Sequence, residues 1–202
     1  MLARYESNPK NNYFAPQFKV ELWSDYIEQA IIDDVLEWVK ENEDVYADHR
    51  WEHYNVFDWD YPTVLLLKER IRRAVDEFCD RVGANKEDKL WIRGWVYPQK
   101  KGMTLERHFH SMHENSFLSG NICLTENPTS TDYDIPYLGL ECVRNVKGMM
   151  VLFPSCLPHR VDELLDGERY TLAFDLLTED GMEYFNKRNK RDDDPLNLAI
   201  LL

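Results

Sequence analysis

Long apolar runs are missing from this sequence: none approaches the ~20 residues that a membrane-spanning helix needs. Met1 to Pro16 also lacks the apolar segment of a signal peptide. The four cysteines lie far apart and form no CxxC pair, which argues against a disulfide framework or a zinc motif. Three of them lie in apolar, strand-like stretches, where reduced and buried thiols are expected. We therefore expect a cytoplasmic protein with no membrane partner.

Positive charge is also scarce. Lys and Arg number 24 against 37 Asp and Glu, and the formal net charge is −13. This balance disfavours general nucleic-acid binding, because a phosphate backbone repels an acidic surface. Apolar residues nevertheless make up 44% of the 202 residues, which is enough for one globular domain with its own core.

The first part of the sequence has the spacing of helices. Residues 1–20 are predicted to be an extended lead-in. Ser24 is the predicted N-cap of an amphipathic helix over about 24–42, where apolar residues recur at helical intervals. A second helix is predicted to begin with Pro62 in its first turn and to end at Gly83.

From Leu90 onward, short β-prone runs replace the helical pattern, and clusters of Gly, Pro, Asn and Asp separate them. Such spacing is typical of a sandwich or a barrel, with the helices packed outside one sheet. A short helix and a tail are expected from about residue 180. The predicted strands are Trp91–Tyr97, Phe117–Leu124, Leu140–Val143, Met149–Phe153 and Tyr170–Leu176.

Histidines are concentrated in the β-rich part. His108 and His110 are two positions apart, so on one strand their side chains share a face and can direct two imidazoles at one point. Imidazole nitrogen suits Fe, Zn, Cu and Ni. His159, on a distant strand, is the best candidate for a third ligand. His49 and His53 lie in a polar, aromatic linker and are interpreted as structural.

Arg169 and Thr171 share one face of the last predicted strand with Ala173, and apolar residues occupy the other face. A guanidinium binds a carboxylate through two parallel hydrogen bonds, and a neighbouring hydroxyl can add a third. The pair therefore predicts a carboxylate site inside the barrel. The alternative is a surface arginine paired with Glu168 or Asp166.

Together, the His-x-His pair, the later Leu-Pro-His and the following Arg-x-Thr resemble the Fe(II)/2-oxoglutarate oxygenase superfamily. More narrowly, three segments resemble the small oxygenases of bacteria and their viruses: His110–Gly120, Gly148–Ser155 and Glu168–Asp175. The resemblance covers roughly residues 90–178.

It implies an α+β fold, a double-stranded β-helix (jelly-roll, cupin-like) barrel with N-terminal supporting helices. One oxygenase domain over residues 1–202 would comprise helical support (1–88), a barrel core (89–178) and a tail (179–202).

The same resemblance implies a non-haem Fe(II)- and 2-oxoglutarate-dependent dioxygenase, a hydroxylase that uses O2 and releases succinate and CO2. Ascorbate would serve as reductant in vitro. His108 and His159 would bind iron. Arg169 and Thr171 would bind the distal carboxylate of 2-oxoglutarate, and Asn121 would contact the cosubstrate or the substrate.

The sequence departs from the superfamily at one position, because His110 stands where Asp or Glu is usual. His110 can itself be the ligand, which makes a three-histidine site. Otherwise His113, Glu114 or water completes the set. A neutral third ligand would leave the iron site one unit more positive than the usual one.

Two other functions fit part of the pattern. A three-histidine cupin-type metalloenzyme would need no 2-oxoglutarate, but it leaves Arg169 and Thr171 unused. A non-enzymatic jelly-roll module would use the histidines structurally. Leu124, Leu152 and Leu172 are predicted to wall the cosubstrate pocket. The aromatic stretch 51–59 and the loop 125–137 are candidate lids, and neither contains a motif that names the substrate.

Overall fold

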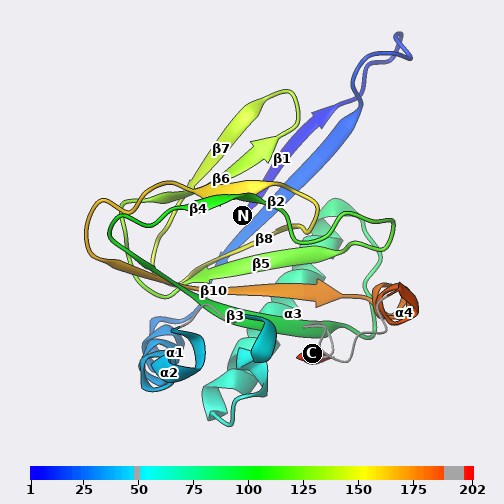
Figure 1. Cartoon of the computed structure of the whole chain (residues 1–202). Coiled ribbons are helices and arrows are strands. Elements are labelled where there is room, and N and C mark those ends of the chain that lie inside the picture. Colours follow the sequence, from blue (N-terminus) through cyan, green and yellow to red (C-terminus); the bar gives the residue numbers. More distant parts are fainter. Residues whose placement is uncertain (48–50, 189–197) are drawn as a thin grey trace.

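Two antiparallel sheets face each other in residues 1–47, 51–188 and 198–202, the part of the chain that the structure, a computed structural model, describes (Figure 1). The first sheet pairs β1 (Leu2–Ser7), β2 (Phe18–Tyr26), β8 (Met149–Pro154), β5 (Leu118–Cys123), β10 (Glu168–Leu177), β3 (Trp91–Lys100) and β11 (Ile200–Leu201), in that order. The second sheet pairs β4 (Leu105–His108), β9 (His159–Val161), β6 (Ser130–Ile135) and β7 (Gly139–Arg144), in that order.

The helical elements lie mainly before β3 in the chain. They are α1 (Gln29–Glu41), α2 (Glu43–Tyr46), the 3-10 turns η1 (Trp51–His53) and η2 (Val56–Asp58), α3 (Pro62–Val82) and α4 (Glu179–Arg188). The predicted ends of α3 are confirmed: Pro62 is in its first turn, and Gly83 caps it with a φ of 72°. No helix in the described ranges is long and apolar enough to cross a membrane.

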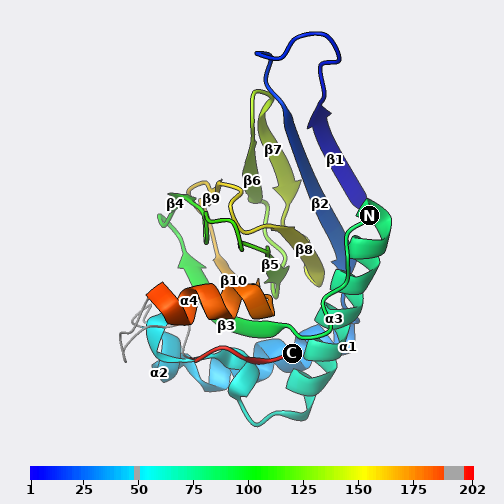
Figure 2. The same cartoon turned by 90° about the vertical axis from the view of Figure 1, so that its right-hand side faces the viewer.

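The predicted helix start at Ser24 is wrong, because Ser24 lies inside β2 and α1 begins at Gln29. β2 pairs with β1 on one side and β8 on the other, and β1 and β2 form a hairpin that extends well beyond the sheet (Figure 2). The predicted extended lead-in and part of the predicted helical support are therefore sheet. Cross-strand pairing, which a local helical pattern does not register, decides this segment.

All five predicted strands are present, with shifted ends, as β3, β5, β7, β8 and β10. Apolar alternation did not identify β4, β6 and β9, because Leu-Glu-Arg-His, Ser-Thr-Asp-Tyr-Asp-Ile and His-Arg-Val have little of it. Only the histidine argument had placed His108 and His159 on strands. All four cysteines are free, and Cys79 and Cys123 are buried. Cys142 and Cys156 are exposed, so the expectation of buried thiols is wrong for these two.

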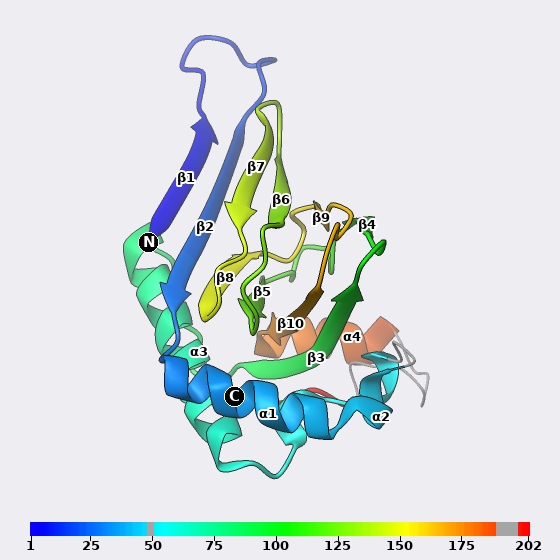
Figure 3. The ribbon, with the colours of Figure 1, turned by 90° about the vertical axis from the view of Figure 1, so that its left-hand side faces the viewer.

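The first sheet has a different core on each face. On one face, side chains such as Ile122, Leu172 and Phe174 pack against α1 and α3, which cover that face (Figure 3). On the other, which we call the inner face, Val151 and Phe153 pack against Tyr133 and Ile135 of the second sheet.

Leu124, Leu152 and Leu172 all lie in the helix-side core, so the prediction that they wall the cosubstrate pocket is wrong. For the two strand residues, Leu152 and Leu172, the cause is the two-residue period of a strand, which puts them on the face opposite Arg169.

β10 lies between β3 and β5, and its register determines what meets on the inner face. The cross-strand neighbours of its inner-face residues are Gln99 for Arg169, Tyr97 and Cys123 for Thr171, Trp95 and Asn121 for Ala173, and Arg93 and Ser119 for Asp175.

Candidate metal centre and cosubstrate pocket

Three histidines converge at one end of the inner space. His108 ends β4 and lies directly opposite His159, the first residue of β9, while His110 follows β4 in a bend. The candidate ligand atoms of His108, His110 and His159 all lie within 4.8 Å of one another. We call these three residues the histidine cluster. The structure therefore brings together the three predicted residues, although His110 lies just beyond the strand on which it was predicted.

Each cluster ring is oriented by a hydrogen bond at Nδ1. His108 Nδ1 lies 2.8 Å from the carbonyl of Glu106, and His159 Nδ1 lies 3.1 Å from that of Leu157. A carbonyl only accepts hydrogen bonds, so both Nδ1 atoms carry the proton and Nε2 keeps its lone pair. This is the arrangement that metal-binding histidines use to fix tautomer and ring direction.

His110 is oriented by a side chain instead. Its Nδ1 lies 2.5 Å from Asp175 Oδ1, and its backbone N–H donates to the carbonyl of Ser155. Asp175 was not among the site residues predicted from the sequence. The signal was present, because Asp175 has the same strand parity as Arg169 and Thr171 and therefore lies on the same face.

Burial favours the neutral form of two cluster rings, His108 and His159. Burial, followed by the nearby His110 and His108, lowers the pKa of His159 to about 3. Burial also lowers the pKa of His108, against the opposing hydrogen bond to Glu106. Burial raises the pKa of Asp175, but His110 and the hydroxyl of Ser119 outweigh it and hold that pKa below its usual value. Neutral imidazoles keep the lone pair that binds a metal ion, and an ionised carboxylate beside them favours a cation at this position.

We expect the metal-free protein to lose stability as the pH falls from 7 to 5. Unfolded, His159 binds a proton near pH 6.5, whereas folded it does so only near pH 3. The unfolded state then holds more protons, so the free energy of unfolding falls, by at most about 1.4 kcal/mol per pH unit for this one group. Urea unfolding of wild type and His159→Gln at pH 7, 6 and 5 measures this. Equal pH slopes in the two proteins would contradict it.

The other predicted ligands lie apart from the cluster. The ring of His113 stacks on Tyr184 of α4, with centroids 4.3 Å apart, and Glu114 is exposed. Of the linker histidines, His53 is exposed, and His49 lies outside the described residues. Among the described residues, the ligand-forming group thus consists of the histidine cluster.

A pocket of about 650 Å³ opens beside the cluster. Its lining includes His108, His110 and Asp175, and it follows the inner face of β3 along Trp95 and Tyr97. Tyr97 is the cross-strand neighbour of Thr171, so this wall leads from the histidines toward Arg169. Ala173 lies between Asp175 and Thr171 on the same face, where its small side chain is partly exposed.

Arg169 is a buried cation, only 2% exposed. Its guanidinium hydrogen bonds reach the side chains of Gln99 at 3.3 Å, Thr131 at 3.2 Å and Asn145 at 3.3 Å, all of them neutral. No ion pair of Arg169 is found among the described residues, so the alternative of a surface pair with Glu168 or Asp166 is wrong. Burial without a counter-charge lowers the pKa of Arg169 and costs stability.

Two buried polar atoms at this end have no hydrogen-bond partner in the described part of the chain: Nε of Arg169 and Oγ1 of Thr171. Both are hydrogen-bond donors, and both lie on the inner face. Donors left unpaired beside a buried cation fit a carboxylate brought in by a ligand.

Asn121 lies on the inner face as well, opposite Ala173. Its Nδ2 donates to the hydroxyl of Tyr133 at 2.9 Å, and the Tyr133 ring lies 5.7 Å from that of His159. Tyr133 is fully buried between the histidine cluster and Arg169, and sequence reasoning missed it because β6 was not recognised.

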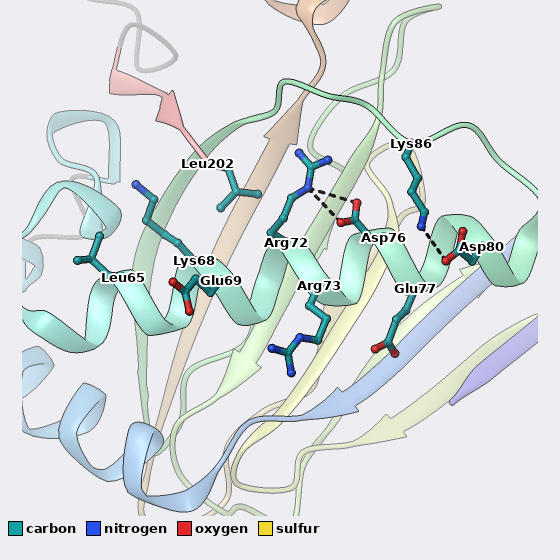
Figure 4. Close-up of a pocket in the computed structure, with 10 residues that line it drawn as sticks. All are labelled: Leu65, Lys68, Glu69, Arg72, Arg73, Asp76, Glu77, Asp80, Lys86 and Leu202. Atoms are coloured by element: carbon teal, nitrogen blue, oxygen red, sulfur yellow. Dashed lines mark hydrogen bonds and ion pairs between the residues drawn. The ribbon is translucent and has the colours of Figure 1, made fainter.

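A second hollow follows the outer surface of α3 (Figure 4). Its lining is mostly charged, and the charges pair locally, Arg72 with Asp76 and Lys86 with Asp80. It has the character of a solvated helix face and lies on α3, away from the strands that hold the histidine cluster.

No protein-family model and no curated protein matches the sequence. Solved structures do match. A prolyl-4-hydroxylase of Pseudomonas putida superposes with a TM-score of 0.62 at 13% identity, covering 78% of this chain and 88% of that one. The viral collagen prolyl hydroxylase of Paramecium Bursaria Chlorella virus-1, solved with 2-oxoglutarate, gives 0.55 at 12%, covering 78% and 95%.

An oxidoreductase of the 2OG-Fe(II) oxygenase family from Burkholderia pseudomallei gives 0.50 at 15%, covering 61% of this chain and 62% of that one. The chain has the fold of the Fe(II)/2-oxoglutarate oxygenases. The fold that the motif resemblance implied is therefore supported by these solved structures. At such identities the likeness establishes the oxygenase fold, and the role of each residue rests on its geometry.

Proposed function

We propose that this protein is a non-haem Fe(II)- and 2-oxoglutarate-dependent dioxygenase, a hydroxylase, whose facing sheets form a double-stranded β-helix. The observation that carries the proposal is the pairing of two features in the space between the two sheets. One end holds the histidine cluster, with ligand atoms within 4.8 Å of one another. The other end holds the buried Arg169, whose hydrogen-bond partners are neutral.

The residues present fit the metal. His108, His110 and His159 would hold Fe(II) through Nε2, because Nδ1 of each ring is occupied by an acceptor. Three imidazoles on one side leave open positions for a cosubstrate and O2, which is the requirement of an oxygenase site. When bound, the iron supplies the oxidising chemistry that couples decarboxylation of 2-oxoglutarate to succinate with oxidation of a substrate C–H bond.

They also fit the cosubstrate. 2-Oxoglutarate carries a carboxylate at each end. Arg169 and Thr171 would bind the distal carboxylate, since their unpaired donor atoms lie together on the inner face. The small side chain of Ala173 leaves room between them and the histidines. We place Asn121 beside the cosubstrate, where its amide holds the hydroxyl of Tyr133 and so keeps that ring in place as a wall.

The substrate would enter by the pocket of about 650 Å³. Trp51, Phe109 and Tyr184 line it, together with His108 and His110, and Trp51 and Phe109 are exposed. Such walls exclude water from the histidines when a substrate with an apolar surface covers them. Of the aromatic stretch 51–59, a candidate lid, Trp51 lines this pocket, whereas Tyr54 and Phe57 lie in the helix-side core.

Purified protein supplied with Fe(II), 2-oxoglutarate and ascorbate is expected to release succinate slowly even without its substrate. The signal should vanish with EDTA and return with Fe(II) but not with Zn(II), because the reaction needs a redox-active ion. Succinate is measured by mass spectrometry, with heat-denatured protein as the control. Absence both of succinate and of 2-oxoglutarate binding to the metal-loaded protein would refute the proposal.

The cupin-type alternative, a three-histidine metalloenzyme without 2-oxoglutarate, accounts for the cluster but leaves Arg169 buried without an anion. Metal binding without 2-oxoglutarate binding would favour it. A non-enzymatic jelly-roll module leaves both features unexplained, and only a protein that cannot be loaded with metal would support it.

A further inference from the structure

One histidine of the cluster differs from the other two in what holds it. The Nδ1 atoms of His108 and His159 both donate to a backbone carbonyl two residues earlier in the chain. His110 donates instead to the Asp175 carboxylate at 2.5 Å. A backbone carbonyl is neutral, whereas this partner brings a full negative charge to the back of one ligand ring.

The carboxylate is itself held in place. Ser119 Oγ lies 2.6 Å from Asp175 Oδ1 and 2.9 Å from Ser155 Oγ. A hydroxyl has one proton to donate, and the ionised carboxylate is the stronger acceptor, so Ser119 donates to Asp175 and accepts from Ser155. The carbonyl of Ser155 accepts the backbone N–H of His110, which closes the network on the same histidine.

The position of this carboxylate bears on the charge of the metal site. With His-x-His and His159, all three proposed ligands are neutral. The usual motif of the superfamily, His-x-Asp or His-x-Glu, instead puts a carboxylate on the metal. Asp175 carries a negative charge that such a ligand would supply. It lies at Nδ1 of His110, on the side of the ring away from the proposed ligand atom Nε2. Arg93 is the charged group opposite it on β3, and its guanidinium stacks on Trp51 and Trp95, 4.8 and 5.4 Å from their ring centroids.

We propose that Asp175 is a positioning residue that supplies the negative charge of the three-histidine metal site through His110, without contacting the metal. This inference rests on the proposed metal site. A carboxylate that accepts from Nδ1 makes the imidazole a stronger electron donor at Nε2 and fixes its direction. Asp175 thereby has the electrostatic role of a metal-bound carboxylate, although it acts through His110 and does not bind the metal itself.

Asp175→Asn is the direct test, because the amide oxygen still accepts from His110 while the charge is gone. Binding of Co(II) alone, without 2-oxoglutarate, is measured by competition with a chromophoric chelator, and the cobalt ligand-field bands are recorded. We expect affinity to fall about 10- to 100-fold and the bands to shift. Asp175→Glu, which restores the charge, should recover part of the affinity. Circular dichroism confirms that each variant is folded.

Asp134→Asn is the matched control. Asp134 is an acid of β6 that pairs with the exposed Arg107 at 2.7 Å, so its loss changes the net charge equally but leaves the network intact. Its cobalt affinity should equal that of wild type. Wild-type affinity and spectrum in Asp175→Asn would overturn the inference alone, as would a folded Asp175→Glu no better than Asp175→Asn. Failure of the wild-type protein to bind metal would instead overturn the proposed function, and the inference with it.

Discussion

Replacing His159 with alanine is expected to abolish tight metal binding and to reduce 2-oxoglutarate-dependent succinate formation to the background of metal-free protein. His159 is the cluster member contributed by the opposite strand, and its ring centroid lies 4.3 Å from that of His108 and 5.1 Å from that of His110. Without it, two imidazoles remain, both from one short segment. Because loss of a partner behind a ligand already costs 10- to 100-fold in affinity, loss of the ligand should cost roughly 100-fold or more.

The measurement is metal content after dialysis, together with Co(II) affinity and succinate yield at saturating Fe(II). His53→Ala is the matched control, since His53 is exposed and lies on η1 outside the cluster. It should retain wild-type values in all three assays. A His159→Ala protein that still binds cobalt with wild-type affinity would show that the metal is held by other residues.

The second large effect is expected from Arg169→Met. Methionine is close to arginine in length but carries no charge, so the variant removes the proposed anchor for the distal carboxylate. Each hydrogen bond to a charged group contributes about 1.5–3 kcal/mol, so the loss of two predicts an increase in the 2-oxoglutarate Kd or KM of roughly 100-fold or more. Metal affinity without 2-oxoglutarate should not change, because Arg169 does not touch the cluster.

The same substitution should not lower the free energy of unfolding of the protein without cosubstrate, and we expect a modest increase. Arg169 is a buried cation without a counter-ion among the described residues, so its removal ends a desolvation cost that we expect to exceed the loss of its hydrogen bonds to neutral side chains. Isothermal titration with 2-oxoglutarate and urea unfolding test the two halves. The control is Arg107→Met, on an exposed arginine. Unchanged 2-oxoglutarate affinity together with a large loss of stability would assign Arg169 a purely structural role.

The fold was predictable where apolar residues recur at a period that a single element explains. α3 has a complete pattern, with Pro62 at its start and Gly83 at its end, and both ends were predicted correctly. β2 was not, because its identity as a strand comes from pairing with β1 and β8, and the helical spacing that begins at Ile27 masks it. The polar β4, β6 and β9 are strands for the same reason, and they carry His108, Tyr133 and His159.

The candidate site was predictable where chemistry depends on residue type and local parity. His108, His110, Arg169 and Thr171 were selected because two-residue spacing puts side chains on one face. Asp175 and Tyr133 were not selected, since their significance comes from contacts with His110 and with Asn121, from segments distant in the sequence. The prediction that Leu152 and Leu172 wall the cosubstrate pocket was wrong, because the two-residue period of a strand places both side chains on the helix side of the sheet.

The amino-acid sequence by itself determined which groups are available: neutral imidazoles, a guanidinium and a hydroxyl, in motifs whose local geometry is set by the period of a strand. Only the tertiary structure decided that β9 lies beside β4, which brings His159 to the other two histidines, and that β10 lies between β5 and β3 in its sheet. Burial then removed water from Arg169, and register put Asp175 behind His110. Strand pairing and burial are properties of segments far apart in the chain, so no local pattern contains them.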